Sequence, residues 1–191
     1  MRKIFILFLL AGTACGLFAQ TSSVNWAMSL LGKNGEGLPL SKPAEMKNGD
    51  VFSIQINLES NAYCYVIAQD SERGVAVLHN AQQSAGSKIV LGPMQITPPA
   101  GTESIFVIVS AGTQKELEAK IAALTTDAGS RRAGRDLVNE VFNLRRDVSK
   151  LKENAEKPVA MGGAFRKMGE TVSGTSYSGA EVYVKTVSVN H

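Results

Sequence analysis

The chain has 191 residues, of which 44% are hydrophobic, and it carries 20 basic and 17 acidic residues for a formal net charge of +3. Loss of Arg2 and Lys3 with the N-terminal segment described below leaves 18 basic against 17 acidic residues, a charge of about +1. This balance argues against nucleic-acid binding, which usually needs a strongly basic face. The length fits one domain around one hydrophobic core.

The chain begins with the pattern of a secretory signal peptide. Arg2 and Lys3 precede an apolar run over residues 4–10, and small residues follow. The apolar segment is shorter than the roughly 20 residues that a membrane-spanning helix needs. We therefore predict residues 1–19 to be a signal peptide cleaved after Ala19, which places the protein in the periplasm or cell envelope.

Cys15 offers an alternative export route. The residues from Leu10 to Ala14 ahead of it resemble a bacterial lipobox, in which lipid is attached to the cysteine sulfur, although Gly12 stands where a larger aliphatic residue is usual. We expect membrane contact only if Cys15 is lipidated. Cleavage after Ala19 instead leaves Cys64 as the only cysteine of the mature chain, and no internal disulfide can form.

Alternation of apolar and polar residues predicts a β-rich domain. The clearest strand covers residues 52–58, whose polar face favours an antiparallel sheet. Segments 62–68 and 104–110 are apolar on both faces, so we expect both in the middle of a sheet. The expected strands before the helices are 24–30, 52–58, 62–68, 75–78, 88–91, 94–97 and 104–110.

At Thr113 the apolar period changes to that of a helix. Thr113 and Glu116 fit a capping box, and the apolar residues of this first helix lie one turn apart on a single face. A second helix is predicted to run from Arg135 until Pro158 ends it. The apolar stripe of the second helix consists of Leu137, Val141, Leu144, Val148 and Leu151.

The stripe of the second helix has two interpretations. It can pack on the sheet of its own domain, or it can form a short coiled-coil seam with a partner. It covers only about two heptads, a marginal length, so we favour packing within the domain. If a partner binds here, the candidate interaction surface consists of Leu137, Val141, Leu144, Arg145, Arg146, Val148 and Leu151.

The basic residues around the second helix form the strongest local charge feature. They could meet anionic lipid or an acidic partner, but interleaved acidic residues favour a solvated helix face. The basic residues are Arg131, Arg132, Arg135, Arg145 and Arg146, and the acidic ones are Asp127, Asp136, Glu140 and Asp147.

The end of the chain predicts a loop followed by a strand. Residues 162–179 are rich in glycine and serine, which favours a loop, and residues 181–189 are rich in β-branched side chains. A strand that returns after two helices implies that residues 113–157 are a helical insertion. We predict a mainly β to α+β fold over residues 20–191: an antiparallel β-sandwich-like domain of about eight strands.

The segment from residue 49 to residue 110 resembles the bacterial family called domain of unknown function 4384. The resemblance is carried by Gly49-Asp50, Asn61 to Ile67, the Gly74 turn before Val77-Leu78, and Pro98 to Glu103 before the apolar strand. His79-Asn80 departs from the Phe-Pro pair that relatives tend to have at this place. The resemblance implies a β-rich module of an exported or membrane-tethered protein, and it carries over no catalytic residue.

Patterns that would indicate catalysis are weak. His79 and His191 are the only histidines and lack partners at metal-binding spacing, although folding could bring the two together at one sheet end. Cys64 lies between two tyrosines in an apolar strand, which favours a buried thiol over a nucleophile. Neither a Gly-x-Ser-x-Gly motif nor a phosphate-binding loop with its lysine occurs.

We therefore predict no catalytic residues, no metal and no cofactor. The favoured function is an exported, non-catalytic binding or assembly module of the bacterial cell envelope, with an unknown envelope protein as its partner. The alternatives are an envelope hydrolase whose site forms only in the fold and a structural lipoprotein anchored through Cys15.

Overall fold

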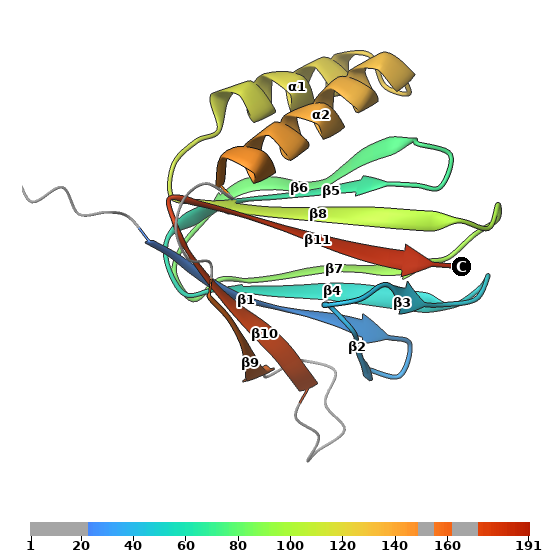
Figure 1. The fold of residues 1–191 in the computed structure, drawn as a ribbon, viewed down its shortest axis with the longest axis horizontal. Coiled ribbons are helices and arrows are strands. Elements are labelled where there is room, and N and C mark those ends of the chain that lie inside the picture. Colours follow the sequence, from blue (N-terminus) through green and yellow to red (C-terminus); the bar gives the residue numbers. More distant parts are fainter. Residues whose placement is uncertain (1–22, 149–154, 162–171) are drawn as a thin grey trace, which may run out of the picture.

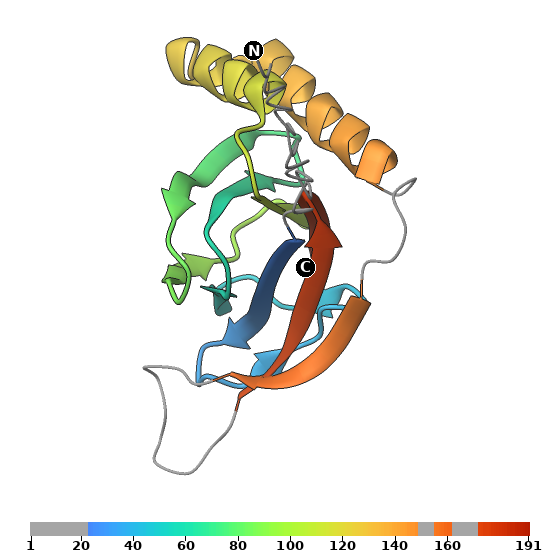
Figure 2. The same ribbon diagram turned by 90° about the vertical axis from the view of Figure 1, so that its left-hand side faces the viewer.

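The computed structural model describes residues 23–148, 155–161 and 172–191. Two β-sheets face each other, and two helices cover the outer face of the second sheet (Figure 1 and Figure 2). The fold is mainly β with a helical layer, which confirms the predicted sandwich-like class. The predicted signal peptide, its cleavage site at Ala19, Cys15 and Leu151 lie outside the described residues.

The first sheet has six strands, and β1 (Ser23–Gly32) lies at its centre. Every strand pair in it is antiparallel, as predicted. In spatial order its strands are β7 (Lys88–Gln95), β4 (Val51–Leu58), β1, β10 (Val172–Ala180) and β9 (Ala155–Met161), and β2 (Gly37–Leu38) pairs with β1.

The second sheet has five strands and carries the helices. In spatial order the strands of this sheet are β3 (Ala44–Glu45), β11 (Val182–Asn190), β8 (Thr102–Ser110), β5 (Ala62–Gln69) and β6 (Val75–Gln83). The two segments predicted as central, β5 and β8, are neighbours in the interior of this sheet. Only the short contact between β3 and β11 is parallel.

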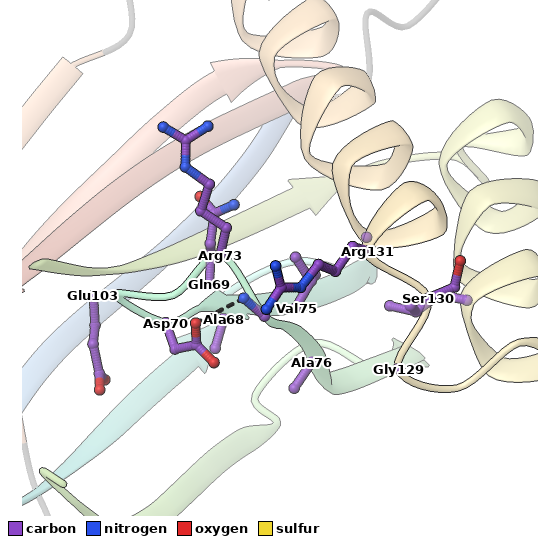
Figure 3. Close-up of a pocket in the computed structure, with 13 residues that line it drawn as sticks. Ala68, Gln69, Asp70, Arg73, Val75, Ala76, Glu103, Gly129, Ser130 and Arg131 are labelled. Atoms are coloured by element: carbon purple, nitrogen blue, oxygen red, sulfur yellow. Dashed lines mark hydrogen bonds between the residues drawn. The ribbon is translucent and has the colours of Figure 1, made fainter. Parts of the chain in front are cut away.

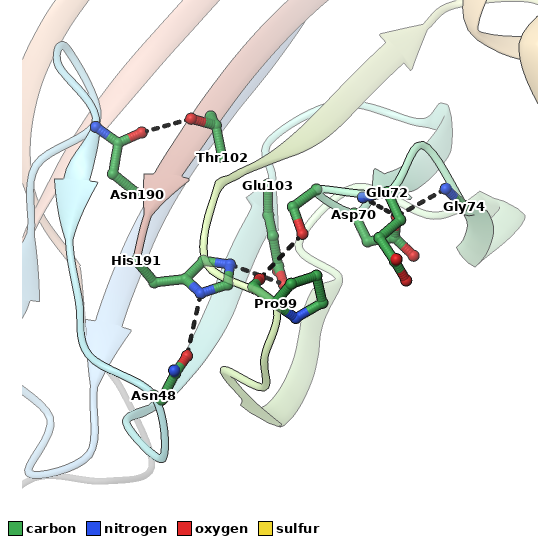
Figure 4. A network of polar contacts seen from close by, with 10 residues as sticks. Asn48, Asp70, Glu72, Gly74, Pro99, Thr102, Glu103, Asn190 and His191 are labelled. Carbon is green, nitrogen blue, oxygen red and sulfur yellow. Dashed lines mark hydrogen bonds and ion pairs between the residues drawn. The ribbon is translucent and has the colours of Figure 1, made fainter.

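The last strand returns to the sheet, as the sequence predicted. β11 pairs with β8 from Val182 opposite Ser110 to Asn190 opposite Thr102. At its end His191 exchanges two backbone hydrogen bonds with Gly101, of 2.8 and 2.9 Å. The His191 ring lies 3.3 Å from Asn48 Oδ1 and 3.6 Å from Glu103 Oε1 (Figure 4). Backbone and side-chain contacts therefore both fix this end of the chain.

One predicted strand break does not occur. Residues 88–91 and 94–97 were expected as two strands because Gly92-Pro93 separates them, but β7 continues through both residues. The pairing with β4 shifts register between Phe52 and Ile54, so the pair is accommodated by an irregularity at the sheet edge. Gly92 has a φ of +111°, and an added Cβ would lie 2.9 Å from the Phe52 carbonyl oxygen.

The predicted boundaries after the helices are wrong. The second helix is described as far as Val148, and Pro158 does not end it but lies in the edge strand β9 opposite Thr175. Of the glycine- and serine-rich segment expected to be a loop, residues 172–179 belong to β10, while 162–171 lie outside the described residues. Sheet pairing and burial of Tyr177 against Trp26 outweigh the weak local strand preference.

Two hydrophobic cores share the strands β5 and β8. Cys64 and Val66 face the core between the sheets, whereas Tyr65 and Ile67 face the helices. Successive side chains of a strand point to opposite faces, so a strand buried on both sides must be apolar throughout. This explains why these two segments show no polar alternation.

The helices pack on the sheet of their own domain. They are α1 (Lys115–Thr126) and α2 (Arg131–Val148). Their buried side chains are Leu117, Ile121, Leu124, Leu137, Val138 and Val141, which contact Tyr65, Ile67, Phe106 and Ile108 of the sheet. The favoured interpretation of the apolar stripe, packing within the domain, therefore holds for Leu137 and Val141.

The start of α1 differs from the predicted capping box. The helix begins after Gln114, and no side chain of that residue caps it. Instead the Tyr65 hydroxyl accepts a hydrogen bond from the Gln114 backbone N–H at 3.3 Å and donates one to Glu118 Oε1 at 2.9 Å. A side chain from β5 thus takes the role expected of Thr113.

We expect Tyr65→Phe to lower the free energy of unfolding by about 1–2 kcal/mol, because it removes both hydrogen bonds at a buried position. Urea denaturation followed by circular dichroism measures this loss. Tyr63→Phe on the same strand is the matched control, because no hydrogen bond of the Tyr63 hydroxyl is found among the described residues. Equal losses in both variants would contradict the capping role.

Candidate functional site

A charged groove lies where the turn between β5 and β6 meets the first turns of α2. It comprises two adjoining cavities of about 280 and 550 Å³. Gln69, Asp70, Arg73 and Arg131 line both cavities, and Arg135 lines the larger one. We call this site the arginine groove, after Arg73, Arg131 and Arg135.

The β5–β6 turn forms one wall of the arginine groove. Asp70 Oδ1 accepts hydrogen bonds from the backbone N–H groups of Glu72 at 2.9 Å and Gly74 at 2.7 Å (Figure 4). Arg73 has a φ of +68°, a conformation that most side chains avoid. An added Cβ at Gly74 would collide with the Asp70 carboxylate. The Asp70 side chain is therefore occupied in closing the turn that presents Arg73.

The opposite wall is the N-terminal half of α2. Ser130 caps the helix by accepting a hydrogen bond from the Ala133 N–H at 3.3 Å. Arg131 and Arg135 are four residues apart and so lie on the same face of the helix. Gly134 lets this end of α2 approach the sheet closely, since an added Cβ would lie 3.0 Å from Val75.

The three arginines of the groove have no partner among the residues that the structure describes: none makes an ion pair or a side-chain hydrogen bond. Figure 3 shows the Arg131 side chain extending from α2 towards the β5–β6 turn. The Arg73 guanidinium extends away from that turn. Glu72 and Glu103 also line the groove, so its walls carry both signs of charge.

An exposed aromatic ring lies at the far end of the larger cavity. Phe142 follows Asn139 along the groove face of α2 and is 47% exposed. Its ring packs edge-on against Phe106, with centroids 5.7 Å apart, so the ring is held in place while one side faces solvent. The groove therefore combines exposed cations with an aromatic ring that is held in place.

The candidate interaction surface predicted from the sequence is divided in the structure. Leu137 and Val141 are fully buried and Leu144 is partly buried against the same core. Val148 is the last described residue of α2, and Leu151 lies outside the described residues. The two predicted cations lie on the exposed side: Arg145 donates to Thr186 Oγ1 at 3.4 Å, and Arg146 donates to Asn143 Oδ1 at 3.0 Å.

The basic cluster of the sequence is also divided. Arg131 and Arg135 line the arginine groove, whereas Arg132 lines a separate hollow with Asp127 and Asp136. Sequence reasoning missed Arg73, because it lies on a turn far from α2 in the chain. No local pattern pointed to it; only the packing of α2 over β6 brings the arginines together.

The histidines do not form a pair. His79 lies on the edge strand β6 and His191 follows β11, with β5 and β8 between those strands. Burial lowers the pKa of His79, whose Nε2 lies 3.3 Å from Gln83 Nε2. Within the described ranges, no group of three or more histidine, cysteine or acidic side chains is placed to hold a metal ion.

Cys64 is a buried thiol, as the sequence indicated. It is 0% exposed in the core between the sheets. Burial disfavours the charged thiolate and raises the pKa of Cys64 to about 12. The side chain thus serves as a small apolar core group.

In the part of the chain that the structure describes, neither helix is long and apolar enough to cross a membrane.

Comparison of the chain with family models, curated proteins and solved structures gives no match. The similarity to domain of unknown function 4384 therefore stays a prediction from the residues named above.

Proposed function

We propose that this protein is an exported, non-catalytic binding module of the bacterial cell envelope, and that its partner docks in the arginine groove. The observation that carries this proposal is the groove itself: three arginines from two distant chain segments line its cavities with no partner among the described residues. Exposed cations held on rigid elements favour recognition of a partner over a purely structural role.

Two of the three acidic side chains that line the groove, Asp70 and Glu103, support binding rather than hydrolysis; the third, Glu72, is exposed on the turn. Asp70 is occupied by two backbone N–H groups of its own turn, and Glu103 faces the His191 ring at 3.6 Å. A hydrolase would need such a carboxylate free to transfer a proton or to attack a substrate. The proposal of export rests on residues 1–19, and the resemblance to domain of unknown function 4384 agrees with it.

Cell fractionation with mass spectrometry of the mature N-terminus tests export. We expect the protein in the periplasm or envelope fraction with Gln20 as its first residue. A lipidated Cys15 at the N-terminus would support the lipoprotein alternative. A cytoplasmic protein that retains Met1 would contradict export altogether.

Site-specific crosslinking in cells tests the docking site. A photoreactive amino acid at Asn139 would lie in the arginine groove, and the control at Val90 would lie on β7, the far edge of the first sheet. Val90 is 43% exposed, which makes it a comparable surface position. We expect a crosslinked envelope protein from position 139 only. No product from position 139, or the same products from both positions, would contradict the proposal.

A further inference from the structure

We infer that the arginine groove takes an acidic peptide segment of a protein partner, with carboxylates spaced along an extended chain and an apolar side chain beside them. This inference rests on the proposed function, because it names the chemistry of the partner at the same site. Four features of the groove support it.

The first feature is the spacing of the cations. Arg131 and Arg135 are one helical turn apart, which places their Cβ atoms roughly 5–6 Å from each other. Acidic residues two positions apart in an extended peptide lie on one side of it, roughly 6.6 Å from each other. The two arginines can therefore each take one carboxylate, and guanidinium groups bind carboxylates through two parallel hydrogen bonds.

The second feature is the mixed charge of the walls. Glu72 and Glu103 line the cavities together with the arginines. These carboxylates would repel a ligand with dense negative charge, such as a phosphate-rich polymer or an anionic membrane surface. A peptide has neutral, hydrogen-bonding backbone between its charged groups, and its N–H groups can donate to the wall carboxylates. The wall composition therefore favours a peptide.

The third feature is Phe142 at the end of the groove. The ring is 47% exposed, yet its edge-on contact with Phe106 fixes its position. An apolar side chain of the ligand would cover the exposed part of this ring. The combination of aromatic and arginine anchors is typical of protein recognition sites.

The fourth feature is the charge at the start of α2. The first turn contains no acidic residue, although the helix dipole favours acidic residues there, and Arg131 and Arg132 occupy it instead. Helix stability alone does not account for these cations. A carboxylate bound to Arg131 would compensate the unfavourable charge.

A peptide array provides the test. The probes are immobilised decapeptides with two glutamates at positions i and i+2 next to leucine or phenylalanine, and matched peptides with glutamine in place of glutamate. We expect purified mature protein to bind members of the first set and none of the second. The affinity of the strongest peptide is then measured in solution by fluorescence anisotropy, at low and at high salt.

Groove variants decide whether binding uses the proposed residues. The double variant Arg131→Gln/Arg135→Gln is expected to weaken peptide binding about tenfold or more, since it removes the charged hydrogen bonds to both carboxylates of the ligand. Arg132→Gln is the control for charge at this helix turn: it removes one of the neighbouring positive charges, but Arg132 lines a different hollow. We expect the affinity of this variant to stay within about twofold of wild type. Arg132 would act on the ligand only through a long-range electrostatic interaction, which salt screens. Thermal unfolding verifies that all variants are folded.

Three results would overturn the inference. They are failure of the acidic peptides to bind, equal binding of the glutamine peptides, and equal weakening by Arg132→Gln and the groove double variant. Sedimentation with phosphatidylglycerol vesicles tests for a fourth such result. The inference also fails if the protein binds these vesicles through Arg131 and Arg135 but does not bind the peptides. If position 139 still crosslinks a partner in cells, the proposed function stands and only the acidic-peptide chemistry fails.

Discussion

Trp26→Ala is expected to lower the free energy of unfolding by about 3–5 kcal/mol, a large part of the stability of a typical domain. Trp26 is 0% exposed on the central strand β1. Its ring stacks on Tyr177 with centroids 4.5 Å apart and meets Tyr183 edge-on at 5.6 Å. The substitution would open a cavity where the Trp26 ring of β1 meets Tyr177 of β10 and Tyr183 of β11. Urea denaturation followed by tryptophan-independent circular dichroism measures the loss.

Two further variants sharpen this test. Phe142→Ala truncates an aromatic ring that is 47% exposed, so we expect a much smaller loss of stability than for Trp26→Ala. Trp26→Phe keeps an aromatic ring and removes an indole N–H that finds no acceptor among the described residues, so its cost is also expected to be smaller. If Trp26→Ala costs no more than Phe142→Ala, the aromatic cluster does not hold the two sheets together.

Raising the pH above 9 is expected to destabilise the protein through Cys64. Burial raises the pKa of this thiol from 9.0 to about 12 in the folded protein. The unfolded chain releases the proton near pH 9, while the folded protein retains it. The stabilising contribution is therefore complete below pH 9 and is lost as the pH rises towards 12. Its full size is about 4 kcal/mol, because each pKa unit corresponds to about 1.4 kcal/mol.

Cys64→Ala isolates this contribution. The variant lacks the titrating thiol, so the stability difference between wild type and variant should shrink or reverse between pH 8 and pH 11. Subtracting the two pH profiles removes the contribution of Tyr65, whose pKa burial also raises to about 12. A stability difference that does not change with pH would show that Cys64 is accessible to water. Slow reaction of the native thiol with iodoacetamide at pH 8, and fast reaction in urea, is the matching chemical result.

The arginine groove shows a limit of sequence reasoning. The stripe from Leu137 was named as a candidate partner surface, and Leu137 and Val141 turn out to be buried in the second core. A helix face that is apolar in sequence shows that something covers it, but not whether the cover is the same chain or another one. The charged face of the same helix, which the interleaved acidic residues favoured as a solvated face, contributes Arg131 and Arg135 to the arginine groove.

The sequence by itself determined the elements in which burial sets the spacing of apolar residues. They are the alternating strand β4, the strands β5 and β8, which are apolar on both faces, and the helices α1 and α2 with their apolar stripes. These patterns are local, because each follows from one element facing one core. It also correctly indicated that β11 returns to the sheet and that Cys64 is buried.

Only the tertiary structure decided where β9 and β10 run, how α1 begins and which arginines meet. β10 is poor in strand-forming residues and exists because β1 and β9 offer it hydrogen-bond partners on both sides. The cap of α1 is a tyrosine hydroxyl nearly fifty residues away in the chain. Arg73 and Arg131 share a groove because α2 packs over β6 near Gly134. Contacts between distant segments leave no periodic trace in either segment, so the sequence alone could not reveal them.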